Sequence, residues 1–305
     1  MPELPEVETV RRGLHELIIG RTIKSVQEFE SPKSFPNSAS DIKAFLIGAD
    51  VIDVRRRAKV LLIDFSSEYT LVAHLKMTGQ LVFVGGTAGA APPRVTRSPQ
   101  PERFGAGHPN DSLVGELPDR STRVALEFTD GSHLYFNDQR KFGWMKLFPS
   151  LEVPNIDFMR KVGPEPLEDD FTAKEFIGRI RRRNGTTIKA AILDQTVLAG
   201  VGNIYADESL WGAKLHPATR VRDVSDKQLA ELLREIKYVM NLAIEKGGST
   251  DKNYVNAEGK RGSYIDFARV FRQEGKACPR HPNVIIEKIR VAGRGTHICP
   301  ACQLQ

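Results

Sequence analysis

The alternation of apolar and polar positions predicts a β-rich first half. Between residues 51 and 148, apolar runs of strand length are separated by polar turns, which is typical of antiparallel strands. The clearest runs cover residues 51–54, 59–65, 70–75, 81–84, 124–128 and 133–136. The turn Thr129-Asp130-Gly131-Ser132 predicts a hairpin that joins the last two. Several short strands with close turns indicate a sandwich or barrel-like β domain.

Helical periodicity frames this β-rich region. Val7, Val10, Leu14 and Leu17 recur at steps of three and four residues and predict one amphipathic helix near the start. Further helical patterns cover residues 173–182, 188–193, 203–211 and 225–246, and the last 40 residues return to β character. The chain is therefore expected to be an α+β protein.

Composition along the chain suggests where the domains meet. Residues 149–166 are rich in proline and form the best linker, because proline ends regular elements. We expect a first domain over residues 1–148, a helical domain over 167–266 and a small domain over 267–305. Residues 85–119 are dense in Gly, Ala, Pro and Ser without periodicity, which predicts a flexible insertion in the first domain.

Charge and targeting signals narrow the functional classes. The formal net charge of +6 favours contact with polyanions but does not prove it. The acidic, proline-punctuated start lacks the features of a secretory signal, and no apolar run approaches the length of a membrane span. We therefore expect a cytoplasmic protein that has no contact with membranes.

The first residues carry the sharpest chemical feature. Removal of Met1 before the small Pro2 would leave a secondary amine at the chain terminus. An α-amino group has a pKa of about 7.7 to 8, so part of it is neutral and nucleophilic near pH 7, and it can form an iminium with an aldehyde carbon. Glu3 and Glu6 place carboxylates beside this amine. The alternative is that Met-Pro is an ordinary start and that Glu6 only stabilises the first helical turn.

The three cysteines predict a metal site. Cys278 and His281 form one pair at two-residue separation, and Cys299 and Cys302 form a second pair, with seventeen residues between the two pairs. Two such pairs on either side of a β-rich stretch are typical of a zinc ribbon that binds one structural Zn²⁺ in a tetrahedral site. His297 is a weaker candidate for the fourth ligand, and loss of zinc binding is the remaining alternative.

Small residues precede the predicted helix at residues 203–211. The segment Leu198-Ala199-Gly200-Val201-Gly202-Asn203 offers free amides at a helix start, which suits a phosphate. The glycines are equally compatible with tight helix packing. A basic run, Arg179, Arg181, Arg182 and Arg183, either adds phosphate contacts or forms a solvated helix face.

Several motifs, taken in order, resemble those of bacterial formamidopyrimidine-DNA glycosylases, which excise 8-oxoguanine. They are Met1-Pro2-Glu3-Leu4-Pro5-Glu6, Arg56-Arg57-Ala58-Lys59, His74-Leu75-Lys76-Met77-Thr78-Gly79, Asp138-Gln139-Arg140-Lys141-Phe142-Gly143, Gly163-Pro164-Glu165-Pro166-Leu167, Leu193-Asp194-Gln195, the stretch from Ala199 to Glu208, Val291-Ala292-Gly293-Arg294-Gly295-Thr296 and the cysteine segment. The resemblance implies an N-terminal β-sandwich with a flanking helix, and a C-terminal helix-two-turn-helix domain with a zinc ribbon. DNA would lie in the cleft between them.

The resemblance also implies the chemistry. A bifunctional glycosylase and abasic-site lyase of base excision repair would remove oxidised purines (8-oxoguanine and formamidopyrimidines) through a Schiff base at the N-terminal proline, followed by β,δ-elimination. Pro2 would be the nucleophile, Glu3 the acid/base for opening of the sugar ring and Glu6 a second carboxylate of the site. Lys59 would contact phosphate and donate a proton in β-elimination, and Arg294 would bind the phosphate beside the flipped nucleotide.

The remaining roles concern DNA binding. Met77, Arg140 and Phe142 fall where the family carries the side chains that fill the gap left by an extruded base. Lys189 and Asn203 would contact backbone phosphates. The partner would be double-stranded DNA with oxidised bases or abasic sites, bound by a monomer associated with the bacterial nucleoid.

Three departures from the family pattern stand out. His281 replaces a cysteine, and one extra residue separates the ligand pairs. Ser121-Thr122-Arg123 stands in place of a basic, histidine-containing segment, and Gln139 and Lys141 replace a proline and an arginine. Two alternatives stay open: a glycosylase of the endonuclease VIII type, which prefers oxidised pyrimidines, and a DNA-binding protein without catalysis. Leu4 argues against the first, and the presence of Pro2, Glu3 and Lys59 against the second.

Overall fold

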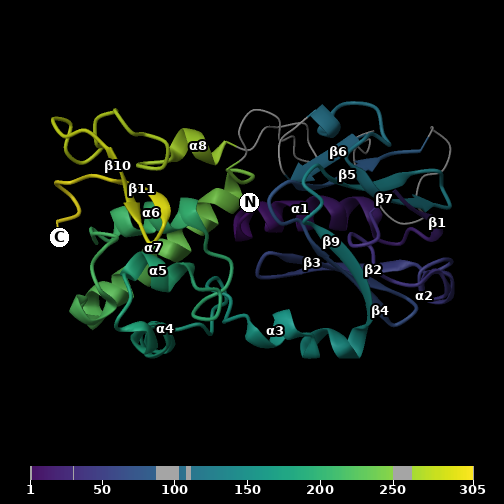
Figure 1. The fold of residues 1–305 in the computed structure, drawn as a ribbon, viewed down its shortest axis with the longest axis horizontal. Helices are drawn as coiled ribbons and strands as arrows, with labels where there is room; N and C mark the ends of the chain where they lie inside the picture. The colour runs from purple at the N-terminus through teal and green to yellow at the C-terminus, as the bar shows by residue number, and fades with distance from the viewer. Residues whose placement is uncertain (1, 30, 87–102, 108–110, 250–262, 305) are drawn as a thin grey trace. The chain divides into compact units, whose positions relative to one another are not determined.

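The computed structural model describes residues 2–29, 31–86, 103–107, 111–249 and 263–304 (Figure 1). The chain folds into two compact units. The first comprises Met1–Pro2, Glu6–Arg160 and Gly247–Gly262, and the second comprises Glu3–Pro5, Lys161–Lys246 and Ser263–Gln305. Each unit has a hydrophobic core of its own.

Two antiparallel sheets make up most of the first unit. One has the order β1 (Ile23–Glu28), β7 (Thr122–Phe128), β8 (His133–Asp138), β5 (Gly79–Val84) and β6 (Arg103–Gly107). The other has the order β2 (Val51–Arg57), β3 (Val60–Phe65), β4 (Tyr69–His74) and β9 (Trp144–Pro149). The turn at residues 129–132 joins β7 to β8 as predicted, with Glu127 opposite His133.

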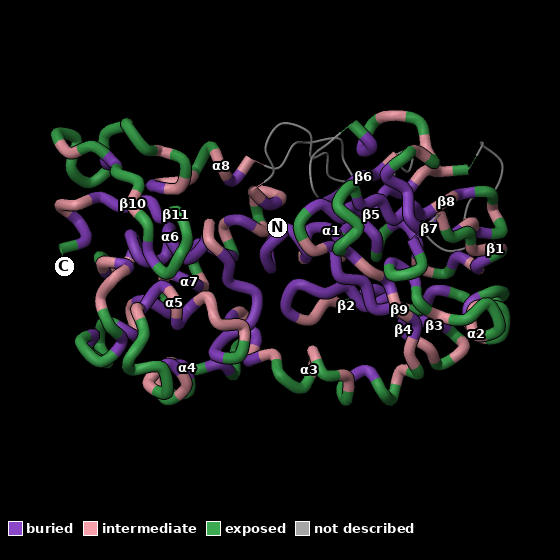
Figure 2. The backbone as a smooth tube through the Cα atoms, in the orientation of Figure 1, coloured by how far each residue is buried: buried purple, intermediate pink, exposed green. Residues whose placement is uncertain are grey.

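Apolar side chains from both sheets meet in one core. Leu61 and Leu71 from one sheet share this cluster with Leu81 and Phe136 from the other. Helix α1 (Leu4–Ile18) adds the predicted apolar face, Val7, Val10, Leu14 and Leu17, to the same cluster. All six residues of β3 are buried (Figure 2), as expected for a strand covered on both faces. The predicted β-sandwich with a flanking helix is therefore confirmed.

The proposed insertion at residues 85–119 contains a strand and a short helix that its composition does not predict. Within residues 85–119, β6 (Arg103–Gly107) pairs with β5, and a short 3-10 helix covers Asp111–Leu113. Phe104 and Ala106 are buried in the core, but the glycines between and after them disguise the strand pattern. Part of the segment predicted to be a flexible insertion thus has regular secondary structure. Residues 87–102 and 108–110 lie outside the described part of the chain.

Two further elements of the first unit lack a strong sequence signal. Strand β1 has a mixed burial pattern, and α2 (Ala39–Phe45) buries no residue completely, although Ser38 caps it by accepting a hydrogen bond from the Asp41 amide. The expected linker, residues 149–166, holds a 3-10 helix at Ser150–Asn155 and α3 (Asp157–Lys161). No helix among the described residues is long and apolar enough to cross a membrane.

The second unit is helical and ends in a β-hairpin. Its elements are α4 (Ala173–Ile180), α5 (Ile188–Leu193), α6 (Asn203–Gly212), α7 (Asp226–Glu245), α8 (Tyr264–Phe267), β10 (Glu287–Val291) and β11 (Arg294–Ile298). The four longest helices match the predicted ranges within two residues at each end. Ser225 and Gln228 form a capping box at the start of α7. Every residue of α6 from Tyr205 onward is buried, so this helix forms the centre of the unit (Figure 2).

Candidate active site

The carboxylate of Glu3 caps the N-terminus of α6. Glu3 is 4% exposed, and its Oε1 accepts a hydrogen bond of 3.0 Å from the main-chain N–H of Ile204. The residue that caps the helix, Gly202, has no side chain to do this. A negative charge at a helix N-terminus is favoured by the unpaired amides and by the helix dipole. Glu3 is therefore held in place by a helix that lies about 200 residues away in the sequence.

This contact favours one of two alternatives that the sequence left open. The segment at residues 198–203 was expected either to offer free amides to a phosphate or to allow tight packing, and Glu3 occupies the position in front of the Ile204 and Tyr205 amides. A Cβ atom at Gly202 would lie 2.2 Å from the Glu3 carboxyl carbon. The glycine is needed here because it lets the carboxylate approach the helix, so its role lies in packing.

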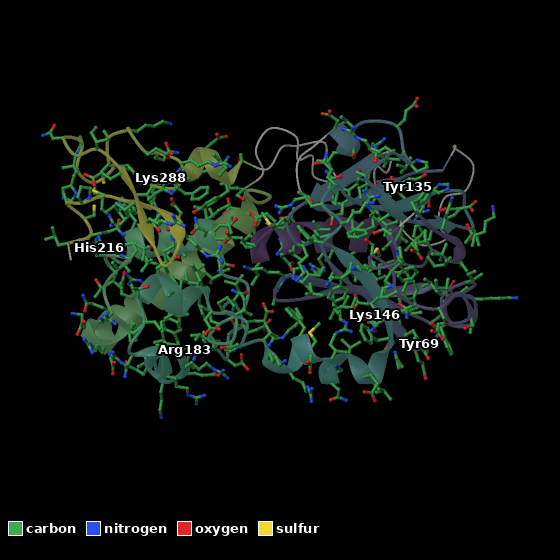
Figure 3. The ribbon with its side chains drawn as sticks, viewed as in Figure 1. Tyr69, Tyr135, Lys146, Arg183, His216 and Lys288 are labelled. Carbon is green, nitrogen blue, oxygen red and sulfur yellow. The ribbon has the colours of Figure 1, made fainter. Side chains whose placement is uncertain are left out.

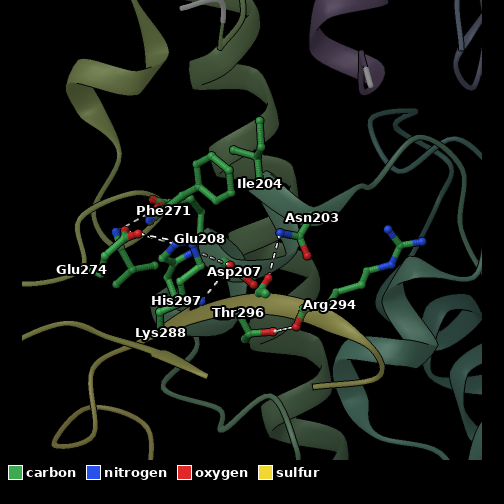
Figure 4. Close-up of polar contacts among 12 residues, drawn as sticks. Asn203, Ile204, Asp207, Glu208, Phe271, Glu274, Lys288, Arg294, Thr296 and His297 are labelled. Carbon is green, nitrogen blue, oxygen red and sulfur yellow. Dashed lines mark hydrogen bonds and ion pairs between the residues drawn. The ribbon is translucent and has the colours of Figure 1, made fainter. Parts of the chain in front are cut away.

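Arg294 lies exposed at the tip of the β10–β11 hairpin. A two-residue turn, Ala292 and Gly293, both with positive φ, joins the strands and places Val291 opposite Arg294. The side chain extends away from the polar cluster around Asp207 and His297 (Figure 4). An exposed guanidinium at a hairpin tip can offer paired donors to a phosphate, so this placement is compatible with the role that the resemblance implies.

Lys189 is placed differently from the expectation. It is 0% exposed, and its ammonium donates to Asp207 Oδ1 at 2.6 Å, Thr296 Oγ1 at 2.7 Å and the Gly295 carbonyl at 3.3 Å. These three acceptors use all three donors of the ammonium. Burial lowers the pKa of Lys189, and Asp207 opposes that shift. The predicted phosphate contact is therefore corrected: Lys189 supports the turn that carries Arg294.

Asn203 supports the same turn. Its side-chain amide Nδ2 donates to the Gly295 carbonyl at 3.0 Å (Figure 4). Gly295 thus receives hydrogen bonds from two residues that were predicted to bind phosphate. A phosphate contact by Asn203 would have to compete with this bond.

Two buried residues of this network have no clear signal in the sequence. Asp207 Oδ2 accepts the main-chain N–H of His297 at 2.9 Å and lies 3.0 Å from its ring Nδ1 (Figure 4). Asp207 Oδ1 binds Lys189. Both residues are at most 3% exposed. A charged residue on a helix is usually interpreted as part of a solvated face, so no feature of the sequence indicates that Asp207 is buried.

The zinc ligands converge as predicted. One donor atom from each of Cys278, His281, Cys299 and Cys302 lies within 4.8 Å of the others. The Cys278 and Cys302 sulfurs are 3.7 Å apart, which matches the edge of about 3.8 Å expected for a tetrahedron with Zn–S bonds of about 2.3 Å. His297 lies outside this group, against Asp207. His281 is therefore the fourth ligand of a structural zinc site.

The protonation of these thiols fits a bound cation. Burial opposes ionisation of Cys278, but main-chain N–H groups of Arg280 and His281 lower its pKa to about 6. Burial and the neighbouring sulfurs raise the pKa of Cys302 to about 12. Three thiolates this close together repel one another, and a divalent cation removes that repulsion.

The zinc ribbon is attached to the far end of α6. Arg280 donates to the carbonyls of Trp211 at 2.7 Å and Gly212 at 3.0 Å, and its guanidinium lies 3.8 Å from the Trp211 ring centroid. Cations at a helix C-terminus complement its dipole. Helix α6 thus holds Glu3 at one end and the zinc ribbon at the other.

The basic run after α4 is mostly committed to structural contacts. Arg181 donates to the carbonyls of Val221 and Val224, and Arg183, labelled in Figure 3, pairs with Asp194 at 2.7 Å. Arg179 pairs with Glu175 on the helix surface. This pattern favours the structural interpretation of the run.

In the first unit, the predicted carboxylate and lysine occupy different elements. Glu6 is 8% exposed in the first turn of α1, and its Oε1 accepts the Ser249 N–H at 2.8 Å. Lys59 is 6% exposed in the two-residue turn between β2 and β3. In the same turn, Arg56 donates to the Ala58 carbonyl at 2.9 Å. Pro2 directly precedes Glu3 in the chain.

His74 lies near Lys59 and is held neutral. Burial, together with the positive charges of Lys76 and Lys59, lowers the pKa of His74 to about 3. Its ring Nδ1 accepts the Lys76 N–H at 3.0 Å, and Trp144 and Phe158 pack against the ring. An uncharged imidazole therefore accepts the hydrogen bond from the Lys76 N–H in the loop before β5.

We expect His74 to make the protein less stable in acid. The unfolded chain protonates this residue below about pH 6.5, whereas the folded chain does so only near pH 3, so unfolding takes up a proton between these values. The free energy of unfolding of the first unit should fall by about 1 kcal/mol per pH unit as the pH decreases through this window. Urea titrations between about pH 7 and pH 5 measure the slope. His74→Phe, which cannot titrate, should have a shallower slope; equal slopes would contradict the assignment.

The three predicted wedge residues lie together in the first unit. Met77 and Phe142 are 45% and 57% exposed. The Arg140 Nη1 lies 3.1 Å from the Met77 sulfur, and its guanidinium lies 5.0 Å from the Phe142 ring centroid. Two large exposed apolar groups around one exposed guanidinium suit insertion between bases.

Family comparisons match the chain in three consecutive segments. Residues 1–145 match the formamidopyrimidine-DNA glycosylase N-terminal domain, and residues 162–254 match the formamidopyrimidine-DNA glycosylase H2TH domain. Residues 284–304 match a zinc finger found in FPG and IleRS. Together these segments cover most of the sequence.

Individual relatives are similar over their whole length. A formamidopyrimidine-DNA glycosylase of Herpetosiphon aurantiacus is 39% identical over 304 residues, covering 99% of this chain and 100% of that protein. The protein of the same name from Pediococcus pentosaceus is 38% identical, with 100% and 99% covered.

Solved structures of Lactococcus lactis Fpg are also similar. A mutant bound to DNA that contains Fapy-dG has a TM-score of 0.83 and 32% identity, with both chains covered completely. A complex with DNA that contains an abasic site has a TM-score of 0.83 and 31% identity, covering 99% of this chain and 100% of that one.

Proposed function

Because this chain belongs to the formamidopyrimidine-DNA glycosylase family, we propose how its own residues perform the reaction of that family. The protein is a DNA glycosylase of base excision repair with abasic-site lyase activity. The substrate we propose is double-stranded DNA that contains an oxidised purine, with 8-oxoguanine and formamidopyrimidines as the main lesions. The protein would act as a monomer on the bacterial nucleoid.

One observation carries the assignment of the nucleophile. The residue that follows Pro2 is anchored by main-chain amides of α6, because Glu3 accepts the Ile204 N–H at 3.0 Å. A chain terminus is ordinarily disordered unless something ties it down. The anchored Glu3 limits the movement of the Pro2 amine, and such restriction is what a nucleophile requires.

In the reaction we propose, the Pro2 nitrogen attacks C1′ of the damaged nucleotide. The N–C1′ bond forms as the glycosidic bond breaks, and the base leaves with that electron pair and takes up a proton. The Pro2 nitrogen gives up its N–H proton to the Glu3 carboxylate, which passes it to the ring oxygen, so the bond between C1′ and this oxygen breaks, the sugar opens and an iminium forms between Pro2 and C1′. The iminium acidifies the C2′ proton, and β-elimination followed by δ-elimination breaks the C–O bonds to the two flanking phosphates.

Positive groups would hold the DNA backbone during these steps. Arg294 at the hairpin tip is exposed and would bind the phosphate beside the flipped nucleotide. Lys59 would bind phosphate and donate a proton in β-elimination. Lys189 and Asn203 would act indirectly, because both bind the Gly295 carbonyl next to Arg294.

Met77, Arg140 and Phe142 would fill the gap that base extrusion leaves. Unstacking a base costs a few kcal/mol, which an inserted wedge offsets. Arg140 would offer its paired donors to the base that has lost its partner, and the other two side chains would fill space. The contact between Arg140 and Met77 supports their acting together.

Rates on two lesions test the proposed substrate class. We expect excision of 8-oxoguanine opposite cytosine to exceed excision of thymine glycol by at least about tenfold in kcat/KM, measured on duplexes of otherwise identical sequence. The reverse preference would indicate an endonuclease VIII-type specificity. Tight binding of both duplexes without cleavage would indicate a DNA-binding protein that lacks catalysis.

A further inference from the structure

Asp138 lies beneath the wedge and is almost completely buried. It ends β8, is 1% exposed, and binds groups on both sides of the loop that carries Arg140 and Phe142. Its Oδ1 accepts hydrogen bonds from the Thr78 hydroxyl and from the Arg140 N–H, the latter at 3.1 Å. Its Oδ2 accepts the Gly143 N–H at 2.6 Å. One carboxylate thus binds the loop at its start and at its end, and also binds the residue that precedes the neighbouring strand β5.

Strand pairing explains why Thr78 is within reach. Gly79, the first residue of β5, lies opposite Asp138, the last residue of β8, in an antiparallel pair. Met77 and Thr78 therefore precede β5 at the same end of the strand pair where the loop that contains Arg140 follows β8. The hydrogen bond from the Thr78 hydroxyl to the Asp138 carboxylate, called the clamp below, connects the two segments that carry the wedge side chains.

The backbone at the end of the loop is adapted to this carboxylate. A Cβ atom at Gly143 would lie 2.8 Å from the Phe136 ring and 3.1 Å from Asp138 Oδ2. Glycine therefore allows the Gly143 N–H to approach the carboxylate. Within the loop, Lys141 has φ of 56°, a left-handed conformation that a non-glycine residue adopts at a cost. Such a conformation persists when the surrounding contacts determine it.

We propose that Asp138, held by Thr78, is a positioning residue that fixes Arg140 and Phe142 against Met77 before DNA binds. This inference rests on the proposed wedge function. The family's proline before Arg140 is Gln139 here, so the stiffness of the loop comes from the clamp. A preformed wedge loses less conformational freedom on insertion than a mobile one, and misplacement by about 1 Å can cost a large factor in rate.

Thr78→Val tests the clamp with an almost isosteric change. It removes the hydroxyl that binds Asp138 and should lower kcat/KM for 8-oxoguanine in duplex DNA by about tenfold. Cleavage of a single-stranded oligonucleotide with an abasic site should stay within about twofold of the parent, because no base pair has to be opened. The rise in fluorescence of a 2-aminopurine placed beside the lesion, which reports unstacking, should slow in parallel with excision. Thr78→Ser keeps the hydroxyl and should restore the parent rate on duplex DNA.

Thr70→Val is the matched control. Thr70 is a buried threonine whose hydroxyl donates to a carboxylate, Asp64, at 2.6 Å, in the other sheet of the same unit. It should lose comparable stability without the selective loss on duplex DNA. The clamp is refuted if Thr78→Val cleaves duplex DNA at the parent rate, or if it loses both activities equally, or if Thr70→Val reproduces its selective loss. Failure of the unaltered protein to cleave the single-stranded abasic oligonucleotide would refute the proposed lyase chemistry instead.

Discussion

A chain whose N-terminus is extended by Gly-Ser ahead of Pro2 is expected to lose both excision and strand cleavage. The extension converts the Pro2 amine into an amide, whose lone pair is delocalised and cannot attack C1′. Removal of a covalent nucleophile should lower the rate on 8-oxoguanine duplexes by on the order of 10³-fold or more. Borohydride trapping measures the intermediate directly, because it reduces the iminium to a stable adduct between protein and DNA.

A tag at the C-terminus is the natural control, because it leaves the amine free and should leave trapping unchanged. The extended chain should still bind lesion DNA, since Arg140 and Arg294 are unaltered, and its affinity should fall steeply with salt as counterions are released. Pro2→Gly keeps a terminal amine but changes its basicity and its freedom of movement. Its adduct with DNA, trapped by borohydride, should therefore form more slowly than that of the parent. An adduct formed by the extended chain would place the nucleophile on another residue, such as Lys59.

Loss of the zinc site is expected to have the second-largest effect. Cys299→Ser removes one of four ligands that lie within 4.8 Å of one another. Binding of structural zinc contributes on the order of 10 kcal/mol to folding of small domains, so the ribbon should unfold. Arg294 would lose its rigid hairpin, and excision should fall by on the order of 100-fold. Zinc content by mass spectrometry and excision rates measure the two consequences.

Two histidine variants test which histidine is the fourth zinc ligand. His281→Cys should retain about one zinc per chain, since four thiolates also form a tetrahedral site. His297→Gln should retain zinc as well, because His297 binds Asp207 and lies outside the cluster. Loss of zinc in His297→Gln together with its retention in Cys299→Ser would contradict this ligand assignment.

Local patterns predicted the elements of this protein well. The amphipathic spacing of Val7 to Leu17 and the apolar runs of strand length between residues 51 and 136 are local features, which neighbouring residues set by themselves. Ligand spacing in the ribbon is likewise local, since each Cys or His pair spans one turn. Strand β6 was missed because its glycines carry no side chain whose burial could be read from the pattern.

Polar partners were harder to predict, as Lys189 and Glu3 illustrate. The family resemblance implied a phosphate contact for Lys189, yet this lysine is buried against Asp207 and Thr296, 18 and 107 residues further along the chain. The Gly200-Val201-Gly202 segment reads as a phosphate cradle, yet Glu3 occupies it. A buried charge needs a partner, but the sequence does not say which distant residue supplies it.

The sequence by itself therefore determined the α+β architecture, the family and the zinc ligands, because each of these depends on residue type and on short spacings. Only the tertiary structure decided which charges reach solvent and which hold the scaffold. Arg294 and Arg140 are left exposed, while Lys189, Asp207 and Asp138 are buried as supports for the loops that carry them. The physical reason is that burial and hydrogen-bond partners arise from contacts between distant segments, which form only when the chain has folded.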